Sequence, residues 1–116
     1  MIRVKRVYED ASPEDGLRVL VDRLWPRGLN KQKARVDLWV KDIAPSHELR
    51  TWFGHDPAKW KDFQSRYRRE LKEQSDALAL LKQKCKEGTV TLLFAARDEE
   101  HNNALVLKSL LDVSKR

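Results

Sequence analysis

Cysteine is nearly absent from this chain, which contains a single one, Cys85. One thiol cannot close an internal disulfide, and it excludes the usual metal sites built from clustered thiols. The chain also lacks an apolar run near the length of a membrane span, and residues 1–5 lack the apolar core of a secretory signal. We therefore expect a cytoplasmic protein without a membrane partner.

Several familiar catalytic motifs are missing as well. The chain has no glycine-rich phosphate loop, no pair of thiols and no nucleophile elbow, so the usual nucleotide hydrolases, thiol redox proteins and serine hydrolases are unsupported. The histidines His47, His55 and His101 are too dispersed to show the local spacing of a metal site. We expect neither a metal nor a cofactor, and we expect disorder only in a short tail at residues 114–116.

Length and charge bound the class of protein. With 116 residues, of which 41% are hydrophobic, the chain is long enough for one domain with a real core and too short for two ordinary ones. A net charge of +6 favours anionic partners such as nucleotides, phosphorylated metabolites or nucleic acid. The 24 basic residues are interleaved with 18 acidic ones, however, so charge alone selects none of these partners.

Apolar strand patterns alternate with helical ones along the chain. Strands are expected near residues 2–7, 17–22 and 89–96, and residues 36–40 fit either a short strand or a helical turn. Helices are expected over residues 46–54, 56–71, 75–87 and 99–113. This order predicts a single α/β domain over residues 1–116, with a largely parallel sheet flanked by helices, because parallel neighbours need crossovers. The nearly apolar segment 17–22 should be a central strand.

Polar residues follow two of these strands. Asp22-Arg23 comes directly after the second strand, and Arg97-Asp98 follows the last one. Ligands of open parallel sheets bind beyond the carboxyl ends of the strands. We therefore expect the two segments to share one pocket.

Each candidate in the first segment has two possible roles. Arg23 and Arg27 could bind a phosphate or carboxylate with their forked donors, or could form internal ion pairs with Asp22 or Asp98. Trp25 could stack on a base or sugar, or could simply be packed in the core.

The second segment is equally ambiguous. Asp98 could be a general base or the N-cap of the last helix, and Arg97 stands beside the same helix start. His101, expected in the first helical turn, could be a neutral base or donor because the helix dipole disfavours its protonated form. Asn102 could contact a ribose hydroxyl or only the backbone. His47 and His55 are poorer candidates, since exposure or capping near a helix start explains them.

Three ordered blocks carry a family resemblance: DGLRVLVDRLWPRG at residues 15–28, APS with LR and WF at residues 44–53, and TLLFAARD at residues 91–98 with His101-Asn102 behind it. In these blocks the chain closely resembles the YeaO-like branch of the uncharacterised family called domain of unknown function 488. The resemblance implies a small α/β domain and names no reaction. Wider relatives often carry Cys-His-Arg near the start of the last helix, where this chain reads His101-Asn102-Asn103. The cysteine of these relatives therefore has no counterpart at this position of the chain.

Three function classes remain. In the first, the protein is an enzyme on a nucleotide-like or other phosphorylated small molecule. Arg23, Arg27 and Arg97 would bind the anion, Asp98 or His101 would move a proton, and Asp22 would orient an arginine. In the second, a nucleic-acid-binding module uses the basic face of the helix at residues 56–72 together with Trp25. In the third, the polar clusters are ion-pair networks of an interaction domain. The sequence indicates no oligomeric state.

Overall fold

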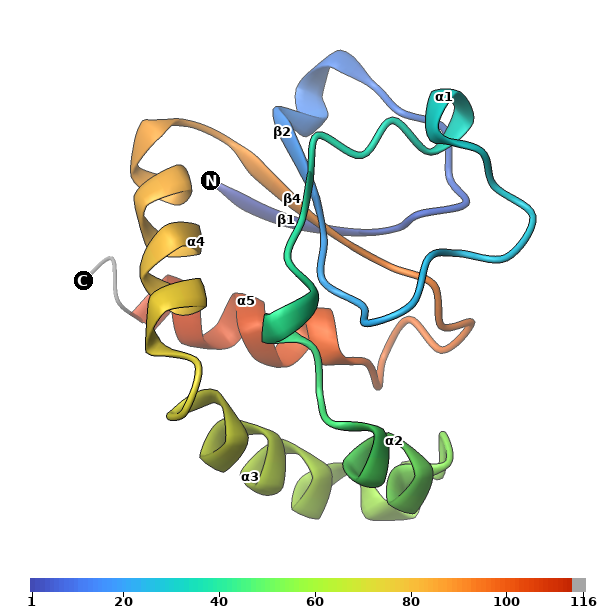
Figure 1. The fold of residues 1–116 in the computed structure, drawn as a ribbon, viewed down its shortest axis with the longest axis vertical. Coiled ribbons are helices and arrows are strands. Elements are labelled where there is room, and N and C mark those ends of the chain that lie inside the picture. The colour runs from blue at the N-terminus through green and yellow to red at the C-terminus, as the bar shows by residue number, and fades with distance from the viewer. Residues whose placement is uncertain (114–116) are drawn as a thin grey trace.

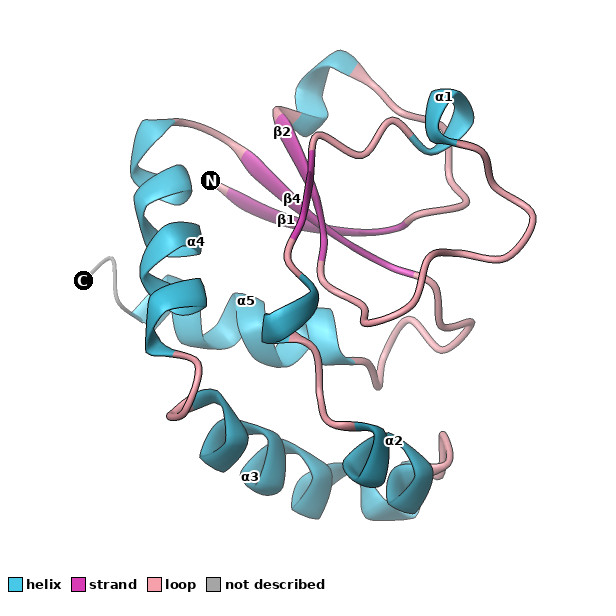
Figure 2. Cartoon of the chain, in the orientation of Figure 1, coloured by secondary structure: helices cyan, strands magenta, loops and turns pink. Residues whose placement is uncertain are grey.

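The computed structural model describes residues 1–113 and shows an α/β architecture built on one parallel sheet (Figures 1 and 2). Its strands are β1 (Ile2–Arg6), β2 (Leu17–Leu20), β3 (Leu38–Trp39) and β4 (Val90–Phe94). Its α-helices are α1 (Lys31–Ala34), α2 (His47–Phe53), α3 (Trp60–Leu71), α4 (Ser75–Glu87) and α5 (Asn103–Val113). The expected class is confirmed, whereas the tail expected at residues 114–116 lies outside the described residues.

The strand order of the sheet is β1-β4-β2-β3, and every neighbouring pair is parallel. β2 and β4 therefore occupy the two inner positions. Their register pairs Leu17 with Val90 and Leu20 with Leu93, so both strands end at the same edge of the sheet. The central position expected for the second strand is confirmed. Residues 36–40 contribute the short edge strand β3.

Side chains of the inner strands alternate between two cores, as the twofold period of a strand requires. Val19 and Leu92 belong to a large core shared with α2, α3, α4 and α5. Leu20 and Leu93 belong to a smaller core on the other face, which α1 and the segment around Trp39 close. Figure 1 shows this division, with α3, α4 and α5 gathered on one side of the strands and α1 on the other.

Local signals position α2 over the strand ends. Ser46 accepts a hydrogen bond from the Leu49 N–H as N-cap, and Gly54 ends the helix in the left-handed conformation, as expected from the sequence. Ser46 also donates from its hydroxyl to Glu70 of α3, and its backbone N–H binds the same carboxylate. These contacts join the start of α2 to α3.

One expected helix start is confirmed and another is wrong. Asp56 caps the helical segment and Pro57 opens it as expected, although residues 57–59 form a 3-10 turn before α3 begins at Trp60. The last helix begins at Asn103 rather than near residue 99, because Asn102 accepts from the Leu105 N–H and so occupies the capping position. Asp98 instead closes a turn before the helix, accepting from the backbone N–H groups of Glu100 and His101.

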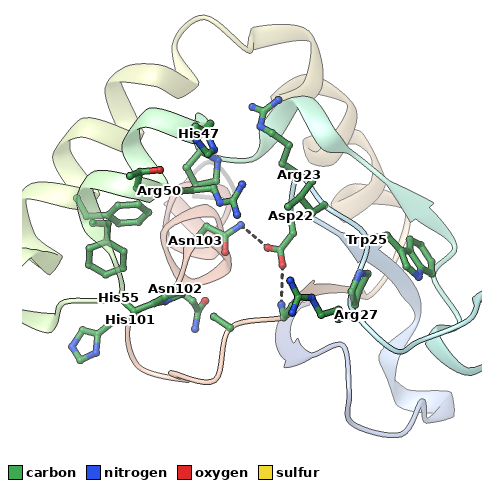
Figure 3. Close-up of a pocket in the computed structure, with 18 of the residues that line it drawn as sticks. Asp22, Arg23, Trp25, Arg27, His47, Arg50, His55, His101, Asn102 and Asn103 are labelled. Carbon is green, nitrogen blue, oxygen red and sulfur yellow. Dashed lines mark hydrogen bonds between the residues drawn. The ribbon is translucent and has the colours of Figure 1, made fainter.

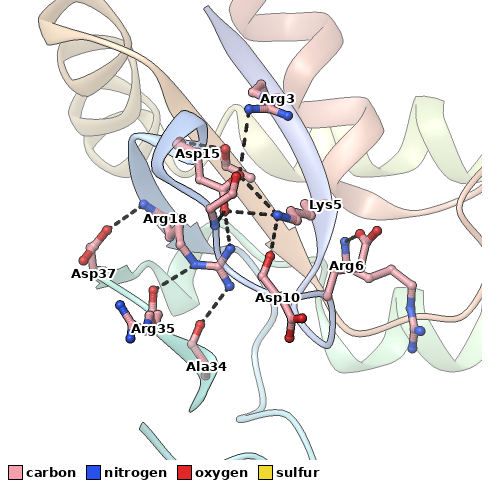
Figure 4. Close-up of polar contacts among 12 residues, drawn as sticks. Arg3, Lys5, Arg6, Asp10, Asp15, Arg18, Ala34, Arg35 and Asp37 are labelled. Atoms are coloured by element: carbon pink, nitrogen blue, oxygen red, sulfur yellow. Dashed lines mark hydrogen bonds and ion pairs between the residues drawn. The ribbon is translucent and has the colours of Figure 1, made fainter. Parts of the chain in front are cut away.

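A buried ion cluster holds the opposite end of β2 (Figure 4). Asp15 is fully buried and pairs with the guanidinium of Arg18 at 2.6 Å and the Lys5 ammonium at 3.2 Å. Arg18 also donates to the backbone oxygens of Ala34 and Arg35, which ties α1 to the sheet. Burial alone would raise the pKa of Asp15, but hydrogen bonds from Ser12, Arg18 and Lys5 outweigh it and lower the pKa to about 2.

Candidate functional site

A pocket of about 430 Å³ opens at the carboxyl ends of β2 and β4 (Figure 3). This volume is in the range of small-molecule sites. The walls come from the segment after β2, from α2 and the turn behind it, and from the connection between β4 and α5. The pocket includes most of the site residues expected from sequence: Asp22, Arg23, Trp25, Arg27, His101 and Asn102.

Asp22 holds the connection after β4 in place. One of its carboxylate oxygens accepts from the backbone N–H of Ala95 at 2.9 Å, and the other accepts from the Asn103 side chain at 3.1 Å. Burial raises the pKa of Asp22, although these hydrogen bonds and the nearby charges of Arg50 and His55 partly oppose the rise. The carboxylate thus links the ends of β2 and β4 with the start of α5.

Three arginines line the pocket: Arg23, Arg27 and Arg50. Within residues 1–113 none of them forms an ion pair with a carboxylate, so the internal pairing considered for Arg23 and Arg27 is not observed. Arg23 makes one long hydrogen bond, at 3.4 Å, to the Ala44 carbonyl oxygen, and its Nε is buried without a partner. Figure 3 shows Arg50 extending from α2 toward Asp22.

Buried guanidinium donors normally find an acceptor, because leaving one unpaired costs about 1–3 kcal/mol or more. The unpartnered Arg23 Nε is therefore an unusual feature of this pocket. An anion bound beside Arg23 would satisfy such a donor.

All three histidines of the chain line the same pocket, although His47 and His55 are poor candidates from sequence. His47 lies in the first turn of α2, and His55 follows Gly54 in a left-handed backbone conformation with φ of 57°. His101 packs edge-on against Trp60, with ring centroids 5.3 Å apart. In the described part of the chain, no group of three or more His, Cys, Asp or Glu residues is arranged to hold a metal ion.

Two expected residues lie outside the pocket lining. Arg97 is exposed, and Asp98 accepts from His101 Nδ1 at 2.8 Å. Hydrogen bonds from the Glu100 N–H and then from His101 lower the pKa of Asp98. His101 precedes α5 instead of lying in its first turn, so the expected effect of the helix dipole does not hold for its position. Both strand ends thus contribute to the pocket, but Arg97 and Asp98 themselves lie outside its lining.

Two further residues of the lining use their polar groups within the fold. The indole N–H of Trp25 donates to the Leu29 carbonyl oxygen at 2.6 Å, and the ring packs edge-on against Trp39. Asn102 is buried, donates to the Asp98 carbonyl oxygen and caps α5. The packing role considered for Trp25 and the backbone role considered for Asn102 are therefore observed.

The basic helix face considered for nucleic acid lies on α3, where Arg66, Arg68 and Arg69 are exposed. Arg66 stacks over the ring of Trp52 at 4.1 Å, and Arg68 donates to the Ser109 hydroxyl. Glu70 and Glu73 line the same shallow groove as Arg69. The face is therefore of mixed charge. None of the helices described in residues 1–113 is both long and apolar enough to cross a membrane.

The fold and the pocket define a class: a small, all-parallel α/β domain with a basic pocket at the carboxyl ends of its inner strands. The chain matches the model of a protein family described as the inactive DUF488-N3 subclade over residues 1–115. The chain belongs to this family.

Relatives extend over nearly the full chain. It is 49% identical over 111 residues to "Uncharacterized protein Rv3073c" of Mycobacterium tuberculosis, covering 96% of this chain and 93% of the relative. It is 41% identical over 110 residues to "Uncharacterized protein YeaO" of Escherichia coli, covering 95% and 96%. The resemblance to YeaO-like proteins is thereby confirmed. No solved structure matches the chain.

Proposed function

We propose that the pocket binds a small phosphate-bearing anion. The observation that carries this proposal is the group of three arginines without ion-pair partners in the described chain, one of which has a buried, unpartnered Nε. Guanidinium groups suit phosphate because they offer parallel donors and stay charged at all relevant pH values. The position at the carboxyl ends of parallel strands agrees with where such folds hold ligands.

We propose binding without turnover in preference to the enzyme considered from sequence. The description of the family as inactive supports this choice. A general base works best when its pKa is near the working pH, whereas Asp98 has a lowered pKa and lies outside the pocket lining. Asp22 has a raised pKa but uses both carboxylate oxygens for structural hydrogen bonds.

The first prediction concerns Arg50→Ala. This substitution should weaken binding of a phosphate-bearing ligand about tenfold or more, since a charge-assisted hydrogen bond is worth roughly 1.5–3 kcal/mol. Anionic metabolites would be screened by thermal shift, and the best ligand measured by calorimetry on wild type and variant. Arg97→Ala is the matched control, because Arg97 is exposed like Arg50 and carries the same charge but lies outside the pocket lining.

Equal losses in both variants would point to a general effect of net charge and would contradict a pocket contact.

The double variant Arg68→Glu/Arg69→Glu tests the nucleic-acid alternative in the same experiment. If α3 contacts the phosphate backbone of a nucleic acid, this variant should lose affinity for an oligonucleotide, and its binding affinity should depend less on salt concentration. If the pocket is the site, the double variant should bind the small anion like wild type.

A further inference from the structure

We infer that the ligand is an organic phosphomonoester, a terminal phosphate on a small uncharged group, rather than a diester, a simple carboxylate or a bare phosphate ion. This inference rests on the proposed anion pocket and specifies its ligand. Two independent properties of the pocket support it: its charge and its size.

Charge decides between phosphate forms. Three guanidinium groups share the pocket with one carboxylate, that of Asp22, which leaves an excess of two positive charges before any histidine is protonated. A phosphomonoester carries roughly −1.5 to −2 at neutral pH, because its second pKa is about 6. A diester or a carboxylate carries a single negative charge and would leave one arginine uncompensated. A monoester therefore matches the charge of the lining.

Size and lining decide between a bare ion and an organic ligand. Because one water occupies about 30 Å³ of liquid, a pocket of about 430 Å³ has far more room than an inorganic phosphate needs. Apolar side chains line part of that space. Tyr8, which follows β1, is 40% exposed, and half-buried Ala95 and Ala96 follow β4. An uncharged organic group would cover these surfaces while the phosphate contacts the arginines.

The arginines and the apolar surfaces come from different elements. Arg23 and Arg27 belong to the segment after β2, and Arg50 belongs to α2. Ala95 and Ala96 belong to the connection after β4, which Asp22 holds through the Ala95 N–H. The ligand would thus bridge the ends of both inner strands.

The test uses matched ligands on the wild-type protein, so no variant has to fold. Adenosine monophosphate and cyclic adenosine monophosphate share the same organic group and differ by one ester bond and one charge. Ribose phosphate and its methyl ester form a second pair without the base. Adenosine and inorganic phosphate complete the set. Calorimetry at about pH 8 keeps the monoesters dianionic, two units above a second pKa of about 6.

In at least one pair the monoester should bind about tenfold more tightly than its diester, because one added charge a few ångströms from an arginine is worth at least that factor even near a protein surface. That monoester should also bind more tightly than inorganic phosphate. Equal affinity within both pairs would overturn the inference while leaving an anion pocket in place. Inorganic phosphate binding as tightly as the monoesters would overturn the need for an organic group. If no phosphate in the set binds, the proposed function itself fails.

Discussion

Gly16→Ala is expected to destabilise the fold by several kcal/mol. Gly16 has a φ of 62° and a ψ of −135°, a sparsely populated conformation that costs other residues roughly 1–3 kcal/mol. A Cβ there would also lie 2.2 Å from the Thr89 carbonyl oxygen. That oxygen accepts from the Leu17 N–H at 2.9 Å, so the backbone cannot move away without breaking the start of β2. Overpacking adds about 1–3 kcal/mol or more. Urea unfolding would measure the loss.

Gly28→Ala separates the two causes of this loss. Gly28 also has a positive φ, 77°, but no heavy atom lies within 4 Å of the point that a Cβ would occupy, so it tests a positive φ without the steric clash. We expect a loss of only about 1–2 kcal/mol for this variant. Similar losses for both variants would show that Gly16 is needed only for its backbone conformation and that the close contact with Thr89 is unimportant.

Asp15→Asn is expected to cost about 3–5 kcal/mol, because breaking a buried pair leaves the Arg18 charge buried without a counter-charge. Arg18 is only 3% exposed, so solvent cannot replace the lost carboxylate. Asp37→Asn is the matched control. Asp37 accepts a hydrogen bond from the backbone N–H of the same arginine but is exposed, and its substitution should cost about 1 kcal/mol or less. Denaturant unfolding of the two variants would make the comparison.

The same carboxylate predicts the response to acid. The folded pKa of Asp15, about 2, lies below its ordinary value of 3.8, so ionised Asp15 stabilises the native state above pH 3.8. This stabilisation should fall as the pH drops from 3.8 toward 2. Asp15→Asn should lose that part of the acid dependence. A variant with an unchanged acid profile and wild-type stability would contradict a structural role for the cluster.

Much of the fold could be predicted because local patterns and tertiary packing agree. Residues 17–22 and 89–96 are apolar enough to be covered on both faces, and they form the two inner strands. Ser46 and Gly54 are strong end signals and bound α2 as expected. The start of α5 could not be predicted in the same way. Asp98 and Asn102 are both good caps, and only the turn closed by Asp98 shows that the helix begins after Asn102.

The candidate pocket could be predicted only in part. The residues after β2 could be predicted, but the residues of α2 and of the turn behind it reach the pocket only through the packing of α2. Asp22, Arg23 and Arg27 follow a strand directly, and the parallel-sheet rule places them at its carboxyl end. Arg50 gives no such signal, because one arginine on an amphipathic helix resembles any solvated cation. His47 and His55 give none for the same reason. The packing of α2 and α3 brings these residues to the strand ends, and no local pattern encodes that packing.

Amide NMR during a titration with adenosine monophosphate tests the central claim most directly, because it locates binding without any substitution. If the pocket binds an organic phosphomonoester, amide shifts should change in a saturable way at residues 22–27, at Ala95 and Ala96, and near Arg50. Amides in α4, which lies outside the pocket lining, should stay constant. Saturable changes confined to α3 around Arg68 and Arg69, with the strand ends unaffected, would contradict the account.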